Sequence, residues 1–173
     1  MKRAYIPNAF TFINLSLGIC SILSTMDGNY ALASTFIILA GLVDRYDGRI
    51  ARFLNASSEL GKELDSLADL VSFGVAPSIL SFILFNFKDV GPTSLIGFIV
   101  LISFPICGAF RLARYNVSTF DGVFAGVPIT IAGCFMALFV LLTLRVNMSA
   151  IVPMLLMVVF SYLMVSNFKL KKF

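Results

Sequence analysis

Four aspartates, at positions 44, 47, 65 and 69, lie within one short stretch of an otherwise apolar chain. A carboxylate at the centre of a membrane helix costs about 2.5–3.5 kcal/mol, so a group of them needs partners. Four carboxylates held together repel one another, and two divalent cations would cancel their charge. Oxygen ligands suit Mg²⁺ or Mn²⁺, and a two-metal site can clamp a displacement at phosphorus. The acids therefore predict phosphoryl-transfer chemistry.

Helical spacing places these acids on two surfaces that can face each other. Near the end of a helix expected at 30–54, five positions fall within a wedge of roughly 140°: Asp44, Asp47, Gly48, Ala51 and Arg52. The next expected helix, 60–86, presents Gly61, Asp65 and Asp69 on one face at four-residue spacing. A short loop makes the two helices antiparallel neighbours. The Arg52 guanidinium adds a donor that suits phosphate oxygens.

Two other interpretations of the acids stay open. The carboxylates could form ion pairs and merely end the helices, with the cations Arg45, Arg49, Arg52 and Lys62 as partners. The chain could also be a divalent-cation transporter that uses the four aspartates as an ion path. Against transport, the acids gather near one membrane face, and the last three expected spans contain no matching carboxylate beyond Asp121 in a loop.

The composition indicates an integral membrane protein. The 173 residues are 59% hydrophobic and only 13% charged, whereas a soluble domain carries about 25% charged residues. Histidine is absent and the three cysteines are far apart, without a C-x-x-C pair, which removes the usual zinc and disulfide patterns. Without histidine, a general base has to be a carboxylate.

The apolar segments predict an all-α bundle of six transmembrane helices in one domain, residues 1–173. A span needs roughly 20 apolar residues, and six segments meet this length: 7–25, 30–54, 60–86, 93–115, 123–144 and 149–168. Pro77, Pro105, Pro128 and Pro153 are possible kinks. With the amino terminus inside, eleven of the thirteen lysines and arginines fall at cytoplasmic ends and only Lys88 and Arg145 outside. This bias predicts a cytoplasmic active site, and it explains the pI near 9.1 without nucleic acid.

The acidic segment is similar to a known family signature. From Asp44 to Asp69 it reads D-x-x-D-G-x-x-A-R-x8-G-x-x-x-D-x-x-x-D, which resembles the full signature of the CDP-alcohol phosphotransferases. The resemblance implies that Asp44, Asp47, Asp65 and Asp69 hold two divalent cations and that Asp69 is the general base. It also implies a homodimer in the cell membrane and a CDP site lined by Gly48, Ala51, Arg52, Gly61, Ser66, Asn8 and Thr11. Asn8 and Thr11 could instead cap the first helix.

The flanking segments indicate which alcohol accepts the lipid phosphate. IPNAFTFINLSLG (6–18), DSLADLVSFGVAPS (65–78), FRLARYN (110–116) and FAGVPIT (124–130) resemble the phosphatidylserine synthase branch. This implies transfer from CDP-diacylglycerol, or an archaeal ether-lipid equivalent, to L-serine. Serine-binding candidates are Arg111, Arg114, Asn116 and Lys62, although the two arginines could instead anchor lipid headgroups. Glycerol 3-phosphate or inositol phosphate remains an alternative acceptor.

Overall fold

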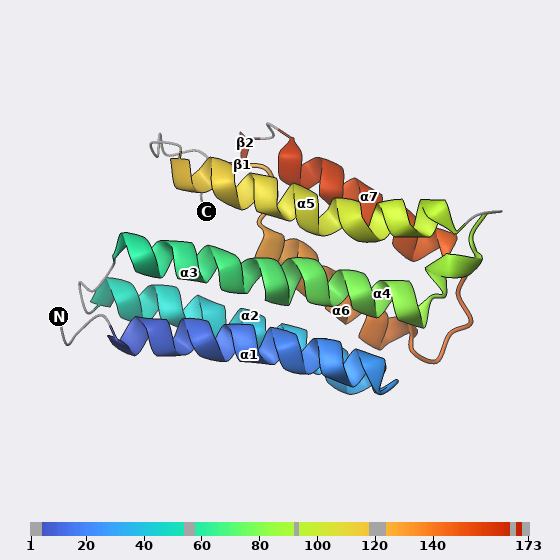
Figure 1. The fold of residues 1–173 in the computed structure, drawn as a ribbon, viewed down its shortest axis with the longest axis horizontal. Coiled ribbons are helices and arrows are strands. Elements are labelled where there is room, and N and C mark those ends of the chain that lie inside the picture. The colour runs from blue at the N-terminus through green and yellow to red at the C-terminus, as the bar shows by residue number, and fades with distance from the viewer. Residues whose placement is uncertain (1–4, 54–57, 92–93, 118–123, 167–168, 171–173) are drawn as a thin grey trace.

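The computed structural model describes residues 5–53, 58–91, 94–117, 124–166 and 169–170, and within them it does not describe the side chains of residues 5–7, 47–53, 124–125 and 169–170. The described residues form six helical rods arranged as an elongated bundle (Figure 1). A two-stranded antiparallel sheet, β1 (Phe124–Ala125) with β2 (Lys169–Leu170), joins two segments of the second half.

The first two helices form an antiparallel pair. Helix α1 (Tyr5–Met26) and helix α2 (Tyr30–Phe53) are joined by a tight turn in which Gly28 adopts φ +75°. That left-handed conformation is unstrained only for a residue without a Cβ. The Asn29 side chain caps α2 by accepting a hydrogen bond from Leu32 N at 3.2 Å. The turn therefore places the acidic end of α2 beside the start of α1.

The third rod changes helical type in its middle. Helix α3 (Glu59–Asp69) starts at Ser58, whose hydroxyl accepts from Gly61 N at 3.0 Å. It continues through the π-helix η1 (Leu70–Val75) into helix α4 (Ala76–Leu84). Pro77, in the first turn of α4, lacks the N–H that an α-helix would donate to Phe73 O. A local π-segment is one way in which a helix adjusts to such a break.

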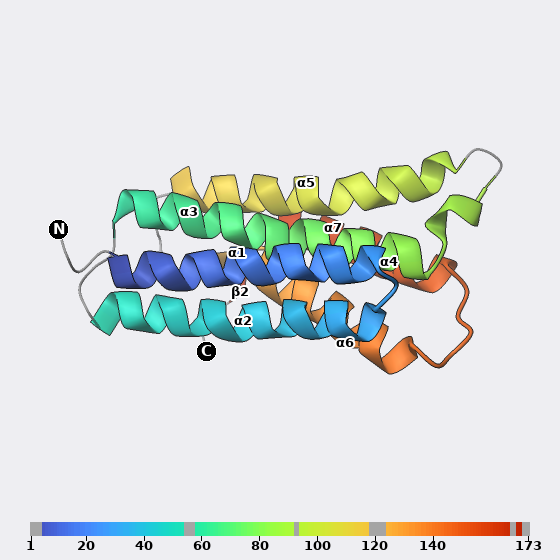
Figure 2. The same ribbon diagram turned by 60° about the horizontal axis from the view of Figure 1, so that its bottom comes forward.

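The second half of the chain contributes three further rods. After the 3₁₀ turn η2 (Phe87–Asp89) comes the long helix α5 (Leu95–Val117), which contains Pro105. Helix α6 (Ile129–Thr143) and helix α7 (Ile151–Val165) are shorter and leave one end of the bundle to α1, α2, α3 and α5 (Figures 1 and 2). We call this end, where α1 and α3 begin and α2 and α5 finish, the charged end.

Segment η1 lies at the centre of the bundle, where two glycines let neighbouring helices approach it. Phe73 is fully buried and belongs to the same core cluster as Phe104 and Ile129. A Cβ at Gly133 of α6 would lie 2.5 Å from Phe73 O, and one at Gly18 of α1 would lie 2.9 Å from the Ser72 Cα. The segment that follows Asp69, the last aspartate of the signature, therefore packs directly against α1 and α6.

The exposed surface of the bundle is suited to lipid. Among the described residues, three stretches are long and apolar enough to cross a membrane: Asn8–Met26, Glu59–Leu84 and Leu95–Val117. The outward face of α5 carries a stripe of large apolar side chains, Ile96, Ile99, Ile102, Ile106 and Phe110. Helices α6 and α7 are apolar but have only 15 residues each. That the chain crosses the membrane six times therefore stays a prediction.

The predicted segments agree with the helices except near the start of the fifth. Helix α6 begins at Ile129 rather than at 123, because Gly126 has φ +78° and Pro128 has an extended ψ of 138°. The preceding residues pair as β1 instead. Pro105 lies within a continuous α5, whereas Pro128 and Pro153 stand at the cap and in the first turn of their helices. Proline is tolerated in the first turn because the N–H there has no intrahelical partner.

Candidate active site

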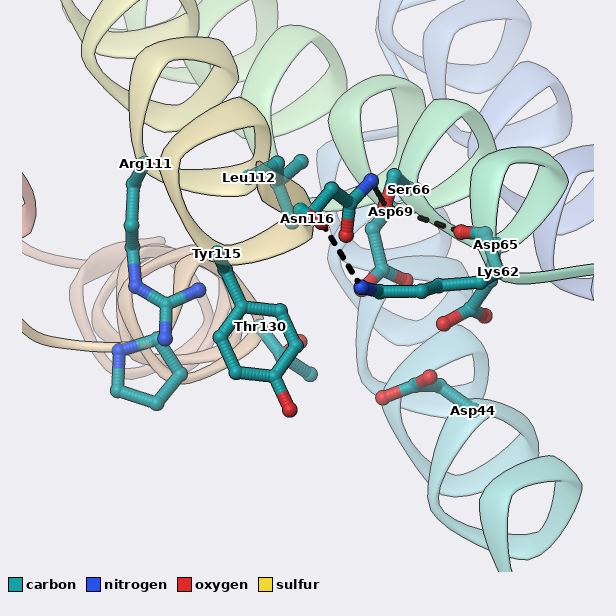
Figure 3. Close-up of a pocket in the computed structure, with 11 residues that line it drawn as sticks. Asp44, Lys62, Asp65, Ser66, Asp69, Arg111, Leu112, Tyr115, Asn116 and Thr130 are labelled. Carbon is teal, nitrogen blue, oxygen red and sulfur yellow. Dashed lines mark hydrogen bonds between the residues drawn. The ribbon is translucent and has the colours of Figure 1, made fainter. Parts of the chain in front are cut away.

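Three of the four aspartates come together at the charged end. Asp44 of α2 and Asp65 and Asp69 of α3 each offer a carboxylate oxygen, and these oxygens all lie within 4.8 Å of one another. Asp69 is only 7% exposed. Figure 3 shows the three side chains converging from the two helices. An all-oxygen donor set of this size fits Mg²⁺ or Mn²⁺, so the geometry is compatible with the predicted metal centre.

For the remaining α2 residues of the signature, the structure describes only the backbone. Asp47, Gly48, Ala51 and Arg52 lie in the last turns of α2, where the backbone is described but the side chains are not. Their predicted roles in metal and CDP binding stay predictions.

The carboxylates form one wall of a cavity of about 340 Å³. This size is within the range of small-ligand sites, roughly 300–1,000 Å³. We call Asp44, Asp65 and Asp69 the carboxylate wall. The facing side, here called the α5–α6 wall, consists of Arg111, Leu112, Tyr115, Pro128 and Thr130. In Figure 3, Tyr115 lies between Arg111 on one side and the acids on the other.

Arg111 is a buried cation within the α5–α6 wall. It is 7% exposed, and its Nε has no hydrogen-bond partner among the described residues. A buried charge is costly unless it is paired. Because Arg111 is the cation of the α5–α6 wall and lines the cavity, it is the strongest anion-binding candidate on this wall.

Asn116 and Lys62 join the two walls at the rim of the cavity. Asn116 Nδ2 donates to Ser66 Oγ at 3.0 Å and to Glu63 Oε1 at 3.2 Å. Lys62 Nζ donates to Asn116 O at 3.3 Å and lies 5.4 Å from the centre of the Tyr115 ring. Lys62, Ser66 and Asn116 all line the cavity, as expected for residues near a substrate.

Arg114 occupies a different place from its neighbour Arg111. Its guanidinium donates to Val165 O at 3.1 Å and to Ser166 O at 3.4 Å, and it is not among the described residues that line the cavity. These two carbonyls end α7, where a cation also complements the helix dipole. The three-residue spacing of the two arginines did not indicate that only Arg111 would line the cavity.

The predicted CDP contacts of α1 lie behind the carboxylate wall. Asn8 is half-buried, and its Oδ1 would be 3.4 Å from a Cβ at Gly61. Thr11 is 4% exposed. Neither residue, nor Gly61, is among the described residues that line the cavity. The atom nearest to a Cβ at Gly61 would be the capping hydroxyl of Ser58, at 3.1 Å.

Comparison with known proteins agrees with this geometry. The sequence profile of the family described as CDP-alcohol phosphatidyltransferase matches residues 4–165. The chain belongs to this family. It is 38% identical over 173 residues to the CDP-diacylglycerol–serine O-phosphatidyltransferase of Bacillus subtilis, covering 98% of this chain and 91% of that protein.

Two further relatives carry the same name. The protein of Helicobacter pylori strain J99 is 39% identical over 141 residues, which is 79% of this chain but only 57% of that relative. The protein of Saccharomyces cerevisiae is 41% identical over 125 residues, 68% of this chain and 43% of the relative. The chain thus spans little more than half of the Helicobacter relative and nearly all of the Bacillus relative. The predicted family is confirmed.

Several residues of the site were not singled out from the sequence. Thr130 and Pro128 line the cavity, and Asn14 donates from Nδ2 to Asp69 Oδ1 at 3.0 Å. Asn14 has a signal in the sequence, because it continues the three-residue spacing of Asn8 and Thr11 within an apolar helix. Thr130 lies in the FAGVPIT segment, but its approach to the acids depends on long-range folding.

Proposed function

We propose that the chain transfers the phosphatidyl group of CDP-diacylglycerol, or of an equivalent CDP-linked lipid, to the hydroxyl of L-serine, with CMP as the second product. The observation that carries the proposal is one cavity with three clustered carboxylates on one wall and a buried arginine on the other. The family and the names of the relatives support the same reaction.

Two divalent cations would be held by Asp44, Asp65, Asp69 and, from the resemblance, Asp47. The three clustered oxygens and their all-oxygen chemistry support this assignment. When bound, such cations would acidify the acceptor hydroxyl and neutralise charge on the phosphates.

Asp69 is the proposed general base. Its carboxylate accepts the proton of the serine hydroxyl while the serine oxygen forms a bond to the lipid-side phosphorus. The bond from that phosphorus to the oxygen of CMP breaks, and CMP leaves with the electron pair. Burial of Asp69 at 7% exposure limits competition from bulk water.

The nucleotide is proposed to lie along the signature face of α2 and α3. Gly48, Ala51 and Gly61 would allow close approach to the backbone, and Arg52 and Ser66 would donate to phosphate or ribose oxygens. Ser66 already lines the cavity. Asn8 and Thr11 would contribute from α1, where Asn8 Oδ1 would lie 3.4 Å from a Cβ at Gly61.

Arg111 is proposed to bind the carboxylate of serine. Its charge and its place in the lining of the cavity that also contains the three acids suit a small anion. Asn116 and Lys62 close the same side of the cavity and contact each other. Arg114 bonds the carbonyls at the end of α7, so its contribution to serine binding would be indirect.

The predicted membrane arrangement forms part of the proposal. The apolar surface and the three candidate spans support a membrane protein. The positive-inside bias supports six spans with both termini and the charged end in the cytoplasm. The homodimer rests on the family resemblance alone.

The test is CMP release by the purified protein with CDP-diacylglycerol and Mg²⁺ or Mn²⁺. L-serine, glycerol 3-phosphate, inositol and inositol phosphate are supplied in separate reactions. Release with serine alone is expected. Release only with a phosphorylated acceptor would move the chain to another branch, and metal flux into proteoliposomes without CMP would favour a transporter.

A further inference from the structure

A buried amide in the middle of α1 contacts the proposed general base. Asn14 is 1% exposed, and its Nδ2 donates to Asp69 Oδ1 at 3.0 Å. An ionised carboxylate can only accept, so the nitrogen of the amide has to face it. A hydrogen bond to a charged acceptor is stronger than one between neutral groups. The bond therefore restrains one oxygen of Asp69 while the second oxygen keeps its own lone pairs.

The helix segment that carries Asp69 also fixes the backbone of Asn14. Ser72 Oγ, in the first turn of η1, donates to Asn14 O at 2.9 Å. One turn further along α1, Gly18 packs so closely on Ser72 that a Cβ would lie 2.9 Å from the Ser72 Cα. Donor and acceptor thus belong to two backbones that cannot slide independently. This fixes the direction from which the amide meets the carboxylate.

A packing role alone does not explain an asparagine at this position. Asn14 Oδ1 is buried and has no hydrogen-bond partner among the described residues. Such an acceptor carries a desolvation cost that leucine, of similar size, would avoid. Among the described residues, the side chain of Asn14 forms a hydrogen bond with Asp69 alone.

The geometry points to Asn14 as a positioning residue that holds the Asp69 carboxylate in the orientation needed for cation binding and for proton transfer. The inference deepens the proposed function and rests on it for the role of Asp69. Partners in the second layer of a metal site commonly contribute about 10–100-fold to metal affinity or activity. Asn14 acts through Asp69 and binds neither the substrate nor a cation itself.

The experiment compares Asn14→Leu, Asn14→Gln and wild type as purified full-length proteins. Mn²⁺ affinity is measured calorimetrically without substrate, and kcat and KM are measured by CMP release. For Asn14→Leu we expect Mn²⁺ affinity and kcat to fall about 10–100-fold, with little change in the KM for serine or in the unfolding temperature. Asn14→Gln, which keeps the amide, should recover part of both losses.

Ser72→Ala is the matched control, because it removes the bond to Asn14 O and leaves the amide bond to Asp69 in place. Because the close packing of Gly18 on the Ser72 backbone remains, Mn²⁺ affinity and kcat should fall much less than in Asn14→Leu. Wild-type values for Asn14→Leu, or equal losses in Asn14→Leu and Ser72→Ala, would overturn the inference. If Asn14→Leu does not fold, Asn14→Ala carries the same expectation.

The Mn²⁺ affinity tests this inference, whereas CMP release by the wild type tests the proposed function. Failure of serine to support CMP release in wild type would count against the serine assignment only. The Mn²⁺ affinities of the variants would still decide the role of Asn14, because that measurement requires no acceptor.

Discussion

The two walls of the cavity are built in different ways. The carboxylate wall comes from α2 and α3, which follow each other in the chain, so its geometry follows from helical spacing and one short connection. The α5–α6 wall combines α5 with the start of α6, whose position depends on the end of α7. Val127 N donates to Leu163 O at 3.2 Å, and β1 pairs with β2. Under the proposed function, the residues for the chemistry are therefore encoded locally, whereas those for acceptor selection depend on distant contacts.

Asp69→Asn should have the largest effect, because it removes the proposed base and a proposed metal ligand together. General-base catalysis alone contributes roughly 10²–10⁴-fold, so kcat should fall by about 10³-fold or more with every acceptor. CMP release with the full acceptor panel measures this. A variant that keeps more than a tenth of wild-type kcat would show that the carboxylate wall does not carry the chemistry.

Arg111→Gln should distinguish the role of the α5–α6 wall from the role of the carboxylate wall. Loss of a hydrogen-bonded charge costs about 1.5–3 kcal/mol, so the serine KM should rise about 10–100-fold. The KM for the CDP-lipid should stay near wild type. Steady-state kinetics with each substrate varied in turn provides the check. Equal changes in both KM values would mean that Arg111 supports the whole cavity and does not select the acceptor.

Gly133→Ala tests the packing that places the reacting acid. The added Cβ would meet the backbone of Phe73, with 2.5 Å to its oxygen and 2.7 Å to its Cα. Overpacking of this kind costs about 1–3 kcal/mol, so the unfolding temperature in detergent should fall. Gly28→Ala at the α1–α2 turn is a useful contrast, since no atom lies within 4 Å and only its positive φ opposes the change. A larger loss at Gly28 would contradict the close packing of η1.

Arg114→Gln should have the smallest effect. Two hydrogen bonds to the end of α7 are lost from a half-buried side chain, which corresponds to about 1 kcal/mol of stability. The serine KM should rise far less than in Arg111→Gln. Thermal unfolding and serine kinetics of the two variants, measured side by side, decide between a positioning role and direct binding. A serine KM raised as much as in Arg111→Gln would return Arg114 to the binding site.

The sequence predicts the carboxylate wall better than the rest of the molecule. Asp44, Asp65 and Asp69 meet as helical spacing requires. By contrast, η1 was not expected, because Pro77 indicates a break without indicating which helical type absorbs it. The late start of α6 depends on the conformation of Gly126 and on pairing with β2.

The two arginines of α5 show the limit of reasoning from spacing. Arg111 and Arg114 have the same chemistry three residues apart, yet one lines the cavity and the other bonds α7. Which of them lines the cavity depends on the end of α7, since Val165 lies 51 positions after Arg114. Asn14 was missed for a related reason, since its acceptor Asp69 lies on another helix.

The most direct test of the central claim is to measure CMP and phosphatidylserine in the same reaction of the purified protein with CDP-diacylglycerol, L-serine and Mn²⁺. We expect the two products to form in equal amounts and both to disappear in Asp69→Asn. Release of CMP without phosphatidylserine, or phosphatidylserine formation that persists in Asp69→Asn, would contradict the proposed function.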